Sequence, residues 1–265
     1  MAFLYSAQYP VEPKRLKGVK TKMKAVTILA TTLVLVVLTV FLSICPTSVS
    51  ALVITDDASG GGCSSVGNWN ASMKTCTLTQ DLSEPVIVSG TCPSCSPTNN
   101  IILDGAGHSI STTALSGTGI DTRGVNATIR NATVSGFGFN IFVHSRDNVI
   151  ESVRSENSSG GVGVLSSKVT FIRNTFAHNG GAVTFAGSDL TFTQNNFLDN
   201  GNDIGIDVFD VWDSRISLFR PLPEGGNYWS RYDTPGEGCS DTTTDGFCDA
   251  PYSPNTVTRN PLISS

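Results

Sequence analysis

The strongest constraint on the fold of this chain is a repeat of apolar residues at a fixed interval of 21 positions. One column of the repeat consists of Ile120, Ile141, Val162, Val183 and Ile204. Two further columns keep the same interval, and they consist of Val143, Val164, Phe185 and Ile206, and of Ile129, Ile150, Phe171 and Phe192. A constant interval of this kind is typical of a solenoid, in which each repeat is one coil packed on its neighbours.

Within each coil, residues of the first two columns lie two positions apart, as Ile141 and Val143 do. This alternation is typical of a β-strand with one buried face and does not fit a helix. Equivalent side chains of successive coils would lie about 4.8 Å apart, the spacing of neighbouring strands. The sequence therefore predicts an all-β fold, a single-stranded right-handed parallel β-helix of about 21 residues per coil with a cap at each end.

Asparagines repeat at the same interval, at positions where turns are expected. Asn174 and Asn195 form one such pair, and Asn179 and Asn200 form another. Stacked side-chain amides can hydrogen-bond to one another along the axis of such an assembly. We therefore expect two asparagine ladders at the corners of the coils.

The first 51 residues have the pattern of an export signal. Residues 25–44 form an uncharged apolar run after a basic cluster, and small residues precede a predicted cleavage site after Ala51. The run is also long enough to span a bilayer, so a retained membrane anchor is the alternative. Translation from Met23 would give a more ordinary signal. In either case we expect the rest of the chain to be exported to the cell surface, the medium or a periplasm-like space.

Composition divides the rest of the chain into three segments. Residues 52–99 hold four cysteines and irregular strands, and we interpret them as an N-terminal cap. Residues 100–210 hold the coils. Residues 211–265 break the repeat and concentrate Pro, Gly and aromatic residues, so we interpret them as a C-terminal cap. Caps are expected because a bare solenoid end exposes core and unpaired strand edges.

Six cysteines follow the signal segment, and an even number in an exported chain indicates disulfides. They form three groups of neighbours in the sequence, Cys63 and Cys76, Cys92 and Cys95, and Cys239 and Cys248. Pairing within these groups is our interpretation among several possible connectivities. Cys92 and Cys95 have the spacing of a redox motif, but they lie in a loop of Ser, Pro and Thr, which favours a structural disulfide.

The charge balance argues against nucleic acid as a partner. The chain has 17 Lys and Arg against 22 Asp and Glu, a net charge of −5. Removal of residues 1–51 takes away six basic residues and one Glu, which leaves −10 on the exported part. No basic patch remains that could bind a phosphate backbone.

The C-terminal part of the sequence resembles a known family. It contains Asn227-Tyr228-Trp229-Ser230-x-Tyr232, then Asp245-Gly246-Phe247-Cys248-Asp249-Ala250-Pro251-Tyr252, and finally Asn260-Pro261-Leu262. This order is similar to the C-terminal signature of secreted β-helix proteins of the NosD type, and with the coils the resemblance covers residues 100–262. It implies a β-helix fold and a periplasmic, copper-binding role accessory to nitrous-oxide reductase, and similar repeats are common in archaeal surface proteins. Such repeats serve many functions, so the resemblance says more about fold than about activity.

The copper ligands that this resemblance implies are scarce. Copper sites use His, Met and Cys thiolate. After residue 51 the chain offers three histidines and one methionine, His108, His144, His178 and Met73. The histidines fall in different columns of the repeat, and the cysteines are expected to be oxidised. The sequence therefore disfavours a copper site.

Calcium is the cofactor that the sequence favours, at the loop between Asp241 and Asp249. Oxygen ligands at loop positions 1, 3, 5 and 9, a glycine at 6 and a backbone carbonyl at 7 match the start of a calcium loop. The ligands would be Asp241, Thr243, Asp245, the carbonyl of Phe247, and Asp249. Thr243 replaces the usual Asp or Asn, and Tyr252 replaces the bidentate Glu, so an EF-hand is not implied. The alternative is an acidic turn held by a disulfide.

A second candidate site is the column Asp147, Lys168, Asp189 and Asp210, again 21 positions apart. The repeat predicts that Lys168 lies between two carboxylates on the outer surface and that Asp189 lies beside Asp210. Two carboxylates at that spacing would raise one pKa or attract a cation. Because polysaccharide-cleaving β-helix enzymes use acidic and basic residues on an outer face, these are the candidate catalytic residues. The alternative is a solvated turn whose ion pairs contribute little.

Aromatic residues near the C-terminal end are candidates for ligand binding, because aromatic rings can stack on sugars. They are Trp212, Tyr228, Trp229 and Tyr232. The alternative is that they form the core of the C-terminal cap, since Trp and Tyr bury large areas.

Three functions follow from these features. The leading hypothesis is an exported, non-catalytic β-helix protein that binds carbohydrate or a cell-envelope partner and is stabilised by disulfides and calcium. The alternative is a polysaccharide lyase or glycoside hydrolase acting on the outer face. The third is a copper-handling accessory protein of the NosD type, for which ligands are lacking.

Overall fold

The computed structural model describes residues 51–89, 100–206, 215–218 and 226–242. All described residues belong to one compact unit. No helix among the described residues is long and apolar enough to cross a membrane; residues 25–44 lie outside them.

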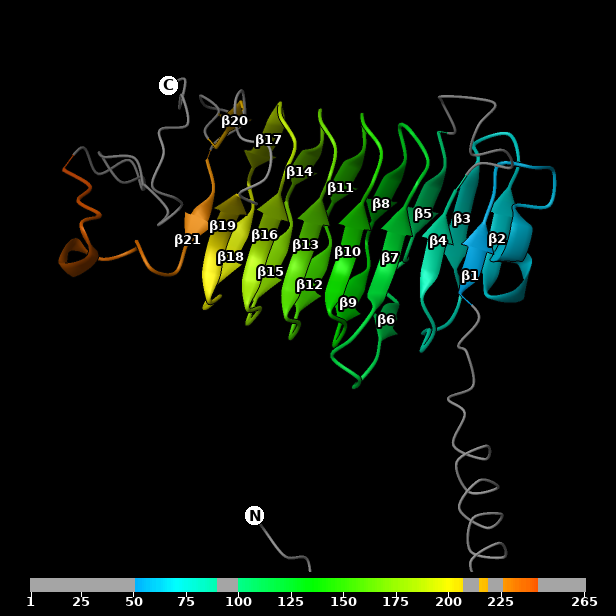
Figure 1. Cartoon of the computed structure of the whole chain (residues 1–265), viewed down its shortest axis with the longest axis horizontal. Coiled ribbons are helices and arrows are strands. Elements are labelled where there is room, and N and C mark those ends of the chain that lie inside the picture. The colour runs from blue at the N-terminus through cyan, green and yellow to red at the C-terminus, as the bar shows by residue number, and fades with distance from the viewer. Residues whose placement is uncertain (1–50, 90–99, 207–214, 219–225, 243–265) are drawn as a thin grey trace, which may run out of the picture. The chain divides into compact units, whose positions relative to one another are not determined.

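Three sheets wind around one axis, and each regular coil adds one strand to each sheet (Figure 1). Sheet A has seven strands, β1 (Leu52–Ile54), β4 (Val86–Val88), β7 (Thr118–Thr122), β10 (Phe139–Val143), β13 (Gly160–Val164), β16 (Gly181–Phe185) and β19 (Asn202–Ile206). Sheet B has eight, β2 (Gly67–Asn70), β3 (Thr75–Leu78), β5 (Ile102–Asp104), β8 (Thr128–Arg130), β11 (Val149–Glu151), β14 (Thr170–Ile172), β17 (Leu190–Thr193) and β20 (Ile216–Ser217). Sheet C has six, β6 (Ser109–Ser111), β9 (Thr133–Ser135), β12 (Arg154–Glu156), β15 (Thr175–Ala177), β18 (Asn196–Leu198) and β21 (Tyr228–Trp229).

The strands pair in the predicted register. Ile141 lies beside Ile120 on one side and beside Val162 on the other, and all pairings between successive coils are parallel. Only the hairpin of β2 and β3 is antiparallel among the paired strands described. The predicted right-handed parallel β-helix is therefore confirmed.

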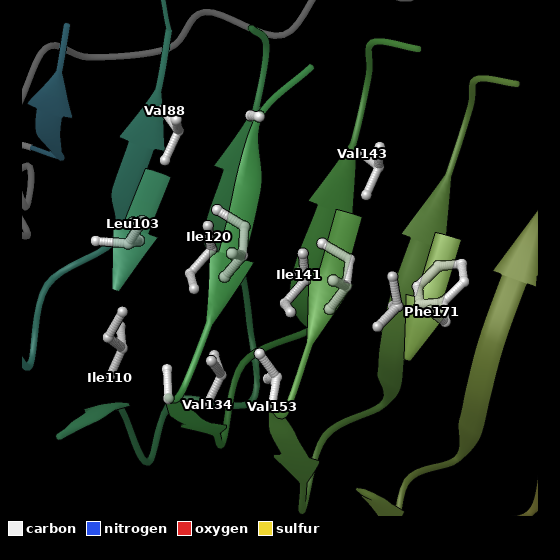
Figure 2. Close-up of a cluster of buried hydrophobic side chains, with 14 of the residues drawn as sticks. Val88, Leu103, Ile110, Ile120, Val134, Ile141, Val143, Val153 and Phe171 are labelled. Carbon is white, nitrogen blue, oxygen red and sulfur yellow. The ribbon is translucent and has the colours of Figure 1, made fainter. Parts of the chain in front are cut away.

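The core is a set of side-chain columns inside the three sheets. Figure 2 shows Ile120 and Ile141 side by side on neighbouring strands, and both are fully buried. Aromatic residues stack in the same way: the rings of Phe171 and Phe192 are 4.6 Å apart and nearly parallel. Burial of such columns from coil to coil supplies the hydrophobic stabilisation that a single coil could not provide.

Both expected asparagine ladders are present at the corners. The Asn174 side-chain amide donates to Oδ1 of Asn195 at 3.0 Å, and that of Asn179 donates to Oδ1 of Asn200 at 3.2 Å. The first ladder continues for one more step, because Asn195 donates to Oδ1 of Asn227 at 2.9 Å. These buried amides satisfy backbone groups where the chain leaves one sheet for the next.

The N-terminal end is closed by a short 3-10 helix and a hairpin. Helix η1 (Gly61–Ser65) carries Cys63, which forms a disulfide with Cys76 on β3, as predicted. Cys92 and Cys95 lie outside the described residues. Cys239 is also disulfide-bonded, and Cys248, its predicted partner, lies outside them.

The last described coil is longer than the regular 21-residue coils that precede it. Ile216 on β20 pairs with Leu190, and Trp229 on β21 pairs with Phe197, separations of 26 and 32 positions instead of 21. The sheets thus continue past residue 210, and a second 3-10 helix, η2 (Pro235–Glu237), follows them. Trp229 is buried and its ring lies 4.1 Å from that of Phe197, so it extends the Phe176 and Phe197 column.

Candidate functional site

The outer face of sheet A differs from the other two because aromatic residues and glycines gather on it. We define the sheet A platform as seven residues of β10, β13, β16 and β19, namely Phe139, Phe142, Gly160, Gly163, Gly181, Thr184 and Gly205. Strand pairing aligns Phe142, Gly163, Thr184 and Gly205 in one column. Side chains in this column alternate with the buried Val and Ile residues of the core, so they face outward.

One half of the platform is apolar and aromatic. Phe139 and Phe142 contact edge to face with ring centroids 5.2 Å apart. Their rings lie over the next coil, because a Cβ on Gly160 would be 2.5 Å from the Phe139 ring and one on Gly163 would be 2.6 Å from the Phe142 ring. These two glycines are therefore required sterically, so that the rings can lie against the backbone.

The other half is flat and open, and its glycines have no such steric requirement. A Cβ on Gly181 would meet only Oγ1 of Thr184, at 3.5 Å, and one on Gly205 would meet the same oxygen at 3.6 Å and a carbonyl at 3.9 Å. Neither glycine has a positive φ. Glycine inside a strand weakens it and often marks a place where a ligand approaches the backbone closely.

Three ionisable residues adjoin the aromatic half. Asp121 is the strand neighbour of Phe142, and its Oδ2 accepts from Nε and Nη2 of Arg123 at 2.9 and 2.7 Å. Nε2 of His144 lies 3.4 Å from Oδ1 of Asp121, and the His144 ring contacts the Phe142 ring at 4.7 Å. Oδ1 is buried and has no hydrogen-bond partner among the described residues. Buried polar atoms without a hydrogen bond are rare in proteins, and a role in a functional site is one explanation for such an atom.

The predicted acidic column has a different structure from the one expected. Asp147, Lys168 and Asp189 do occupy equivalent turn positions with φ of 61, 59 and 57°. However, Asp147 pairs with Arg146 at 2.8 Å and Asp189 pairs with Arg215 at 2.8 Å, and Lys168 takes part in neither pair. The register therefore places Lys168 between two aspartates, each of which forms an ion pair with an arginine.

The described residue next to Asp189 in this column is not the one at the 21-position interval. Leu190 pairs with Ile216, so the residue that follows Asp189 in the column is Arg215. The longer last coil shifts the register by five positions, and a cation replaces the expected like charge. Asp210 itself lies outside the described residues. The described residues of this column do not bring two carboxylates together.

The structure uses two of the four predicted aromatic candidates for packing. Trp229 is in the core column, and Tyr232 packs against the core and donates through its hydroxyl to the carbonyl of Gly238 at 2.8 Å. Tyr228 is 44% exposed, and its hydroxyl donates to Asp233, a hydrogen bond that raises the Tyr228 pKa. Trp212 lies outside the described residues.

The predicted calcium loop falls almost entirely outside the described residues. Asp241 is exposed, and Thr243, Asp245, Phe247 and Asp249 belong to the segment that is not described. Within the described part, no group of three or more His, Cys, Asp or Glu is arranged to hold a metal ion. His108 and His144 lie near Asp81 and Asp121 respectively, on different coils.

These features define the class of the protein: it is a right-handed parallel β-helix protein whose outer sheet A carries an aromatic and glycine surface. Residues 116–219 match the family model described as right handed beta helix region, and this segment includes the whole sheet A platform. Searches of curated proteins and of solved structures gave no significant match.

Proposed function

We propose that this chain is an exported, non-catalytic β-helix protein that binds a polysaccharide on the sheet A platform. The observation that carries the proposal is the pair Gly181 and Gly205. Both lie in strands with open space beyond their Cα atoms, so a side chain would fit there and its absence keeps the surface flat. A ligand that lies against the backbone needs such a flat surface, which explains why side chains are absent at these two positions.

Carbohydrate is the ligand class that the platform fits best. The half-exposed rings of Phe139 and Phe142 offer apolar faces, and sugars present C–H faces that pack on aromatic rings. Thr184, Asp121 and His144 place hydroxyl, carboxylate and imidazole groups around these rings to bind sugar hydroxyls. The platform runs across four neighbouring strands, which suits an extended chain rather than a compact ligand.

Export and stabilisation by ions complete the proposal. The signal-like residues 1–51 and the disulfide between Cys63 and Cys76 support a location in an oxidising space outside the cytoplasm. A cell-envelope glycan is then an accessible partner. Calcium at the loop from Asp241 to Asp249 would stiffen the C-terminal end.

The test is binding of the purified full chain to a panel of acidic and neutral polysaccharides, followed by retardation in gels that contain each polymer. Gly181→Val and Gly205→Val add side chains to the flat half, and we expect each to weaken binding at least about tenfold. Thr170→Val and Thr191→Val are matched controls on the outer face of sheet B and should bind as the wild type does.

Two outcomes would contradict the proposal. If no polymer binds, or if the glycine variants bind as well as the wild type, the platform is not a polysaccharide site. Melting temperatures of all four variants must remain near the wild-type value, so that a loss of binding reports contact and not unfolding.

A lyase or hydrolase that acts on the same face is the second candidate, favoured by the buried Asp121 oxygen that accepts no hydrogen bond and lies beside His144. Incubation of the same polymers with the protein, followed by measurement of new reducing ends or unsaturated products, separates the two. Products released by the wild type and lost in Asp121→Asn would place the protein among the enzymes.

A further inference from the structure

Ionisable groups adjoin the platform where β7 and β10 meet, and together they have more hydrogen-bond donors than acceptors. One carboxylate, that of Asp121, faces two side chains that can carry positive charge, Arg123 and His144. Arg123 uses Nε and Nη2 on a single oxygen, so this pair leaves its Nη1 unused. The Arg123 side chain is 55% exposed and that of His144 is 43% exposed. N–H donors are therefore in excess over acceptors at this point.

The excess of donors is unusual for this chain. Its net charge is −5, and acidic residues outnumber basic ones. Carboxylates elsewhere on the described coils pair with one cation-capable side chain each, as Asp104 does with Arg130 and Asp189 does with Arg215. A place where two cation-capable side chains share one carboxylate at the edge of an aromatic surface is suited to a second, external carboxylate.

The geometry also fixes where that carboxylate would lie. The His144 ring packs against Phe142 at 4.7 Å, so a sugar ring on Phe142 has His144 at its edge. Arg123 is held beside this edge by Asp121, the strand neighbour of Phe142. A guanidinium held in place by one carboxylate can bind another through its remaining N–H groups, with less loss of side-chain freedom than an unrestrained arginine.

We propose that Arg123 and His144 form a subsite for a carboxylated sugar, so that the polysaccharide bound by the platform is one that contains uronic acid. Arg123 binds the sugar carboxylate through Nη1, His144 contacts it or the adjacent hydroxyl, and Phe142 supports the ring face. Asp121 holds the guanidinium in position. This inference rests on the proposed function, since it assigns one end of the same platform.

The experiment compares two forms of one polymer, a polyuronate and the same polymer with its carboxyl groups methyl-esterified, each titrated with the purified full chain. The wild type should bind the acid form at least about tenfold more tightly, the loss expected for one charge-assisted contact. Arg123→Gln and His144→Gln should reduce binding of the acid form and leave that of the ester unchanged. Arg154→Gln removes the same charge on sheet C, where Arg154 pairs with Glu156, and should change neither.

Salt provides a readout that packing alone would not change. Binding of the acid form should weaken as ionic strength rises, and Arg123→Gln should make that dependence shallower, because exposed charges are screened. Equal affinity for the two forms, or equal losses for both forms in Arg123→Gln, would overturn the subsite. If Gly181→Val still abolishes binding in that case, the platform stands without the subsite. If neither form binds, the proposed function itself fails.

Discussion

The inner and outer faces of the same strands follow opposite rules in this molecule. In sheet A, one inward column is aliphatic at every step from Ile120 through Ile141, Val162 and Val183 to Ile204. The outward column next to it changes its chemistry at every step, from Asp121 through Phe142, Gly163 and Thr184 to Gly205. Inside, each residue must fit the residues above and below it, whereas outside each residue is free to meet a ligand.

The largest effect should come from breaking an inner aromatic column. Phe171→Ala removes a fully buried ring that stacks on Phe192, and we expect a loss of about 3–5 kcal/mol in unfolding free energy. Urea denaturation measures this loss. Phe142→Ala on the outer face is the matched variant and should cost clearly less, because its ring is only half-buried. Equal losses would show that the outer ring is structural.

The asparagine ladder should rank next. Asn195→Ala removes an acceptor used by the backbone and side-chain amides of Asn174, and it leaves buried donors unpaired. We expect a loss of about 1–3 kcal/mol. The adjacent Asn196 is exposed, so Asn196→Ala should have almost no effect in the same denaturation experiment. A similar loss of unfolding free energy for the two variants would mean that the buried ladder does not stabilise the fold.

A smaller effect should depend on pH. Burial raises the pKa of Asp104, but hydrogen bonds from Asn131, from the backbone of Ala106 and from Arg130 outweigh it, so the pKa is lowered overall. The folded pKa thus lies below the unfolded one. The stabilisation is present above the unfolded pKa and is lost as the pH falls through the folded pKa. Asp104→Asn should therefore destabilise the protein at neutral pH but not in strong acid; a constant difference across pH would contradict this.

The smallest effect on stability should come from the open half of the platform. Gly181→Val should leave the melting temperature unchanged or slightly raised, because its Cβ has ordinary contacts and valine favours strands. Gly161→Val is the contrasting variant, since its Cβ would lie 2.4 Å from the carbonyl of Ala182. If both variants destabilise the protein equally, Gly181 is needed for folding. The missing side chain at this position is then no evidence for a ligand.

The sequence was sufficient to predict the coils, because their register depends on columns of residues that must stack. The interval between Ile120 and Ile141 and the spacing of Asn174 and Asn195 are direct consequences of one strand per coil. The disulfide between Cys63 and Cys76 followed from proximity in the sequence. Contacts that depend on backbone stacking were thus accessible from the repeat alone.

Contacts made by long side chains could not be predicted from the repeat. The repeat placed Lys168 beside Asp147 but could not show that Arg146, in the same turn, reaches that carboxylate. The longer last coil was also missed, so Trp229 was considered as a ligand-binding residue although it stacks on Phe197. Asn227 could have indicated the longer coil. It precedes Tyr228 and Trp229, and it continues the ladder from Asn195.

The platform was missed although its residues keep the interval of the core. Phe142, Gly163, Thr184 and Gly205 are 21 positions apart, but they share no chemical property, so a search for similar residues passes over them. The signal that could have found them is the contrast between two neighbouring columns. The residue type changes at every step in the outer column, whereas the inner column stays aliphatic.

The register of the asparagine ladder implies that the length of this molecule can change only in whole coils. Each amide binds the equivalent residue of the next coil, and the step from Asn195 to Asn227 keeps this contact although 32 positions separate the two residues instead of 21. Duplication of one coil would lengthen the outer face by about 4.8 Å and keep every inner column intact. The outer face therefore grows in steps of one strand spacing, and under the proposed function the number of coils would set how many units of a polysaccharide the face can contact.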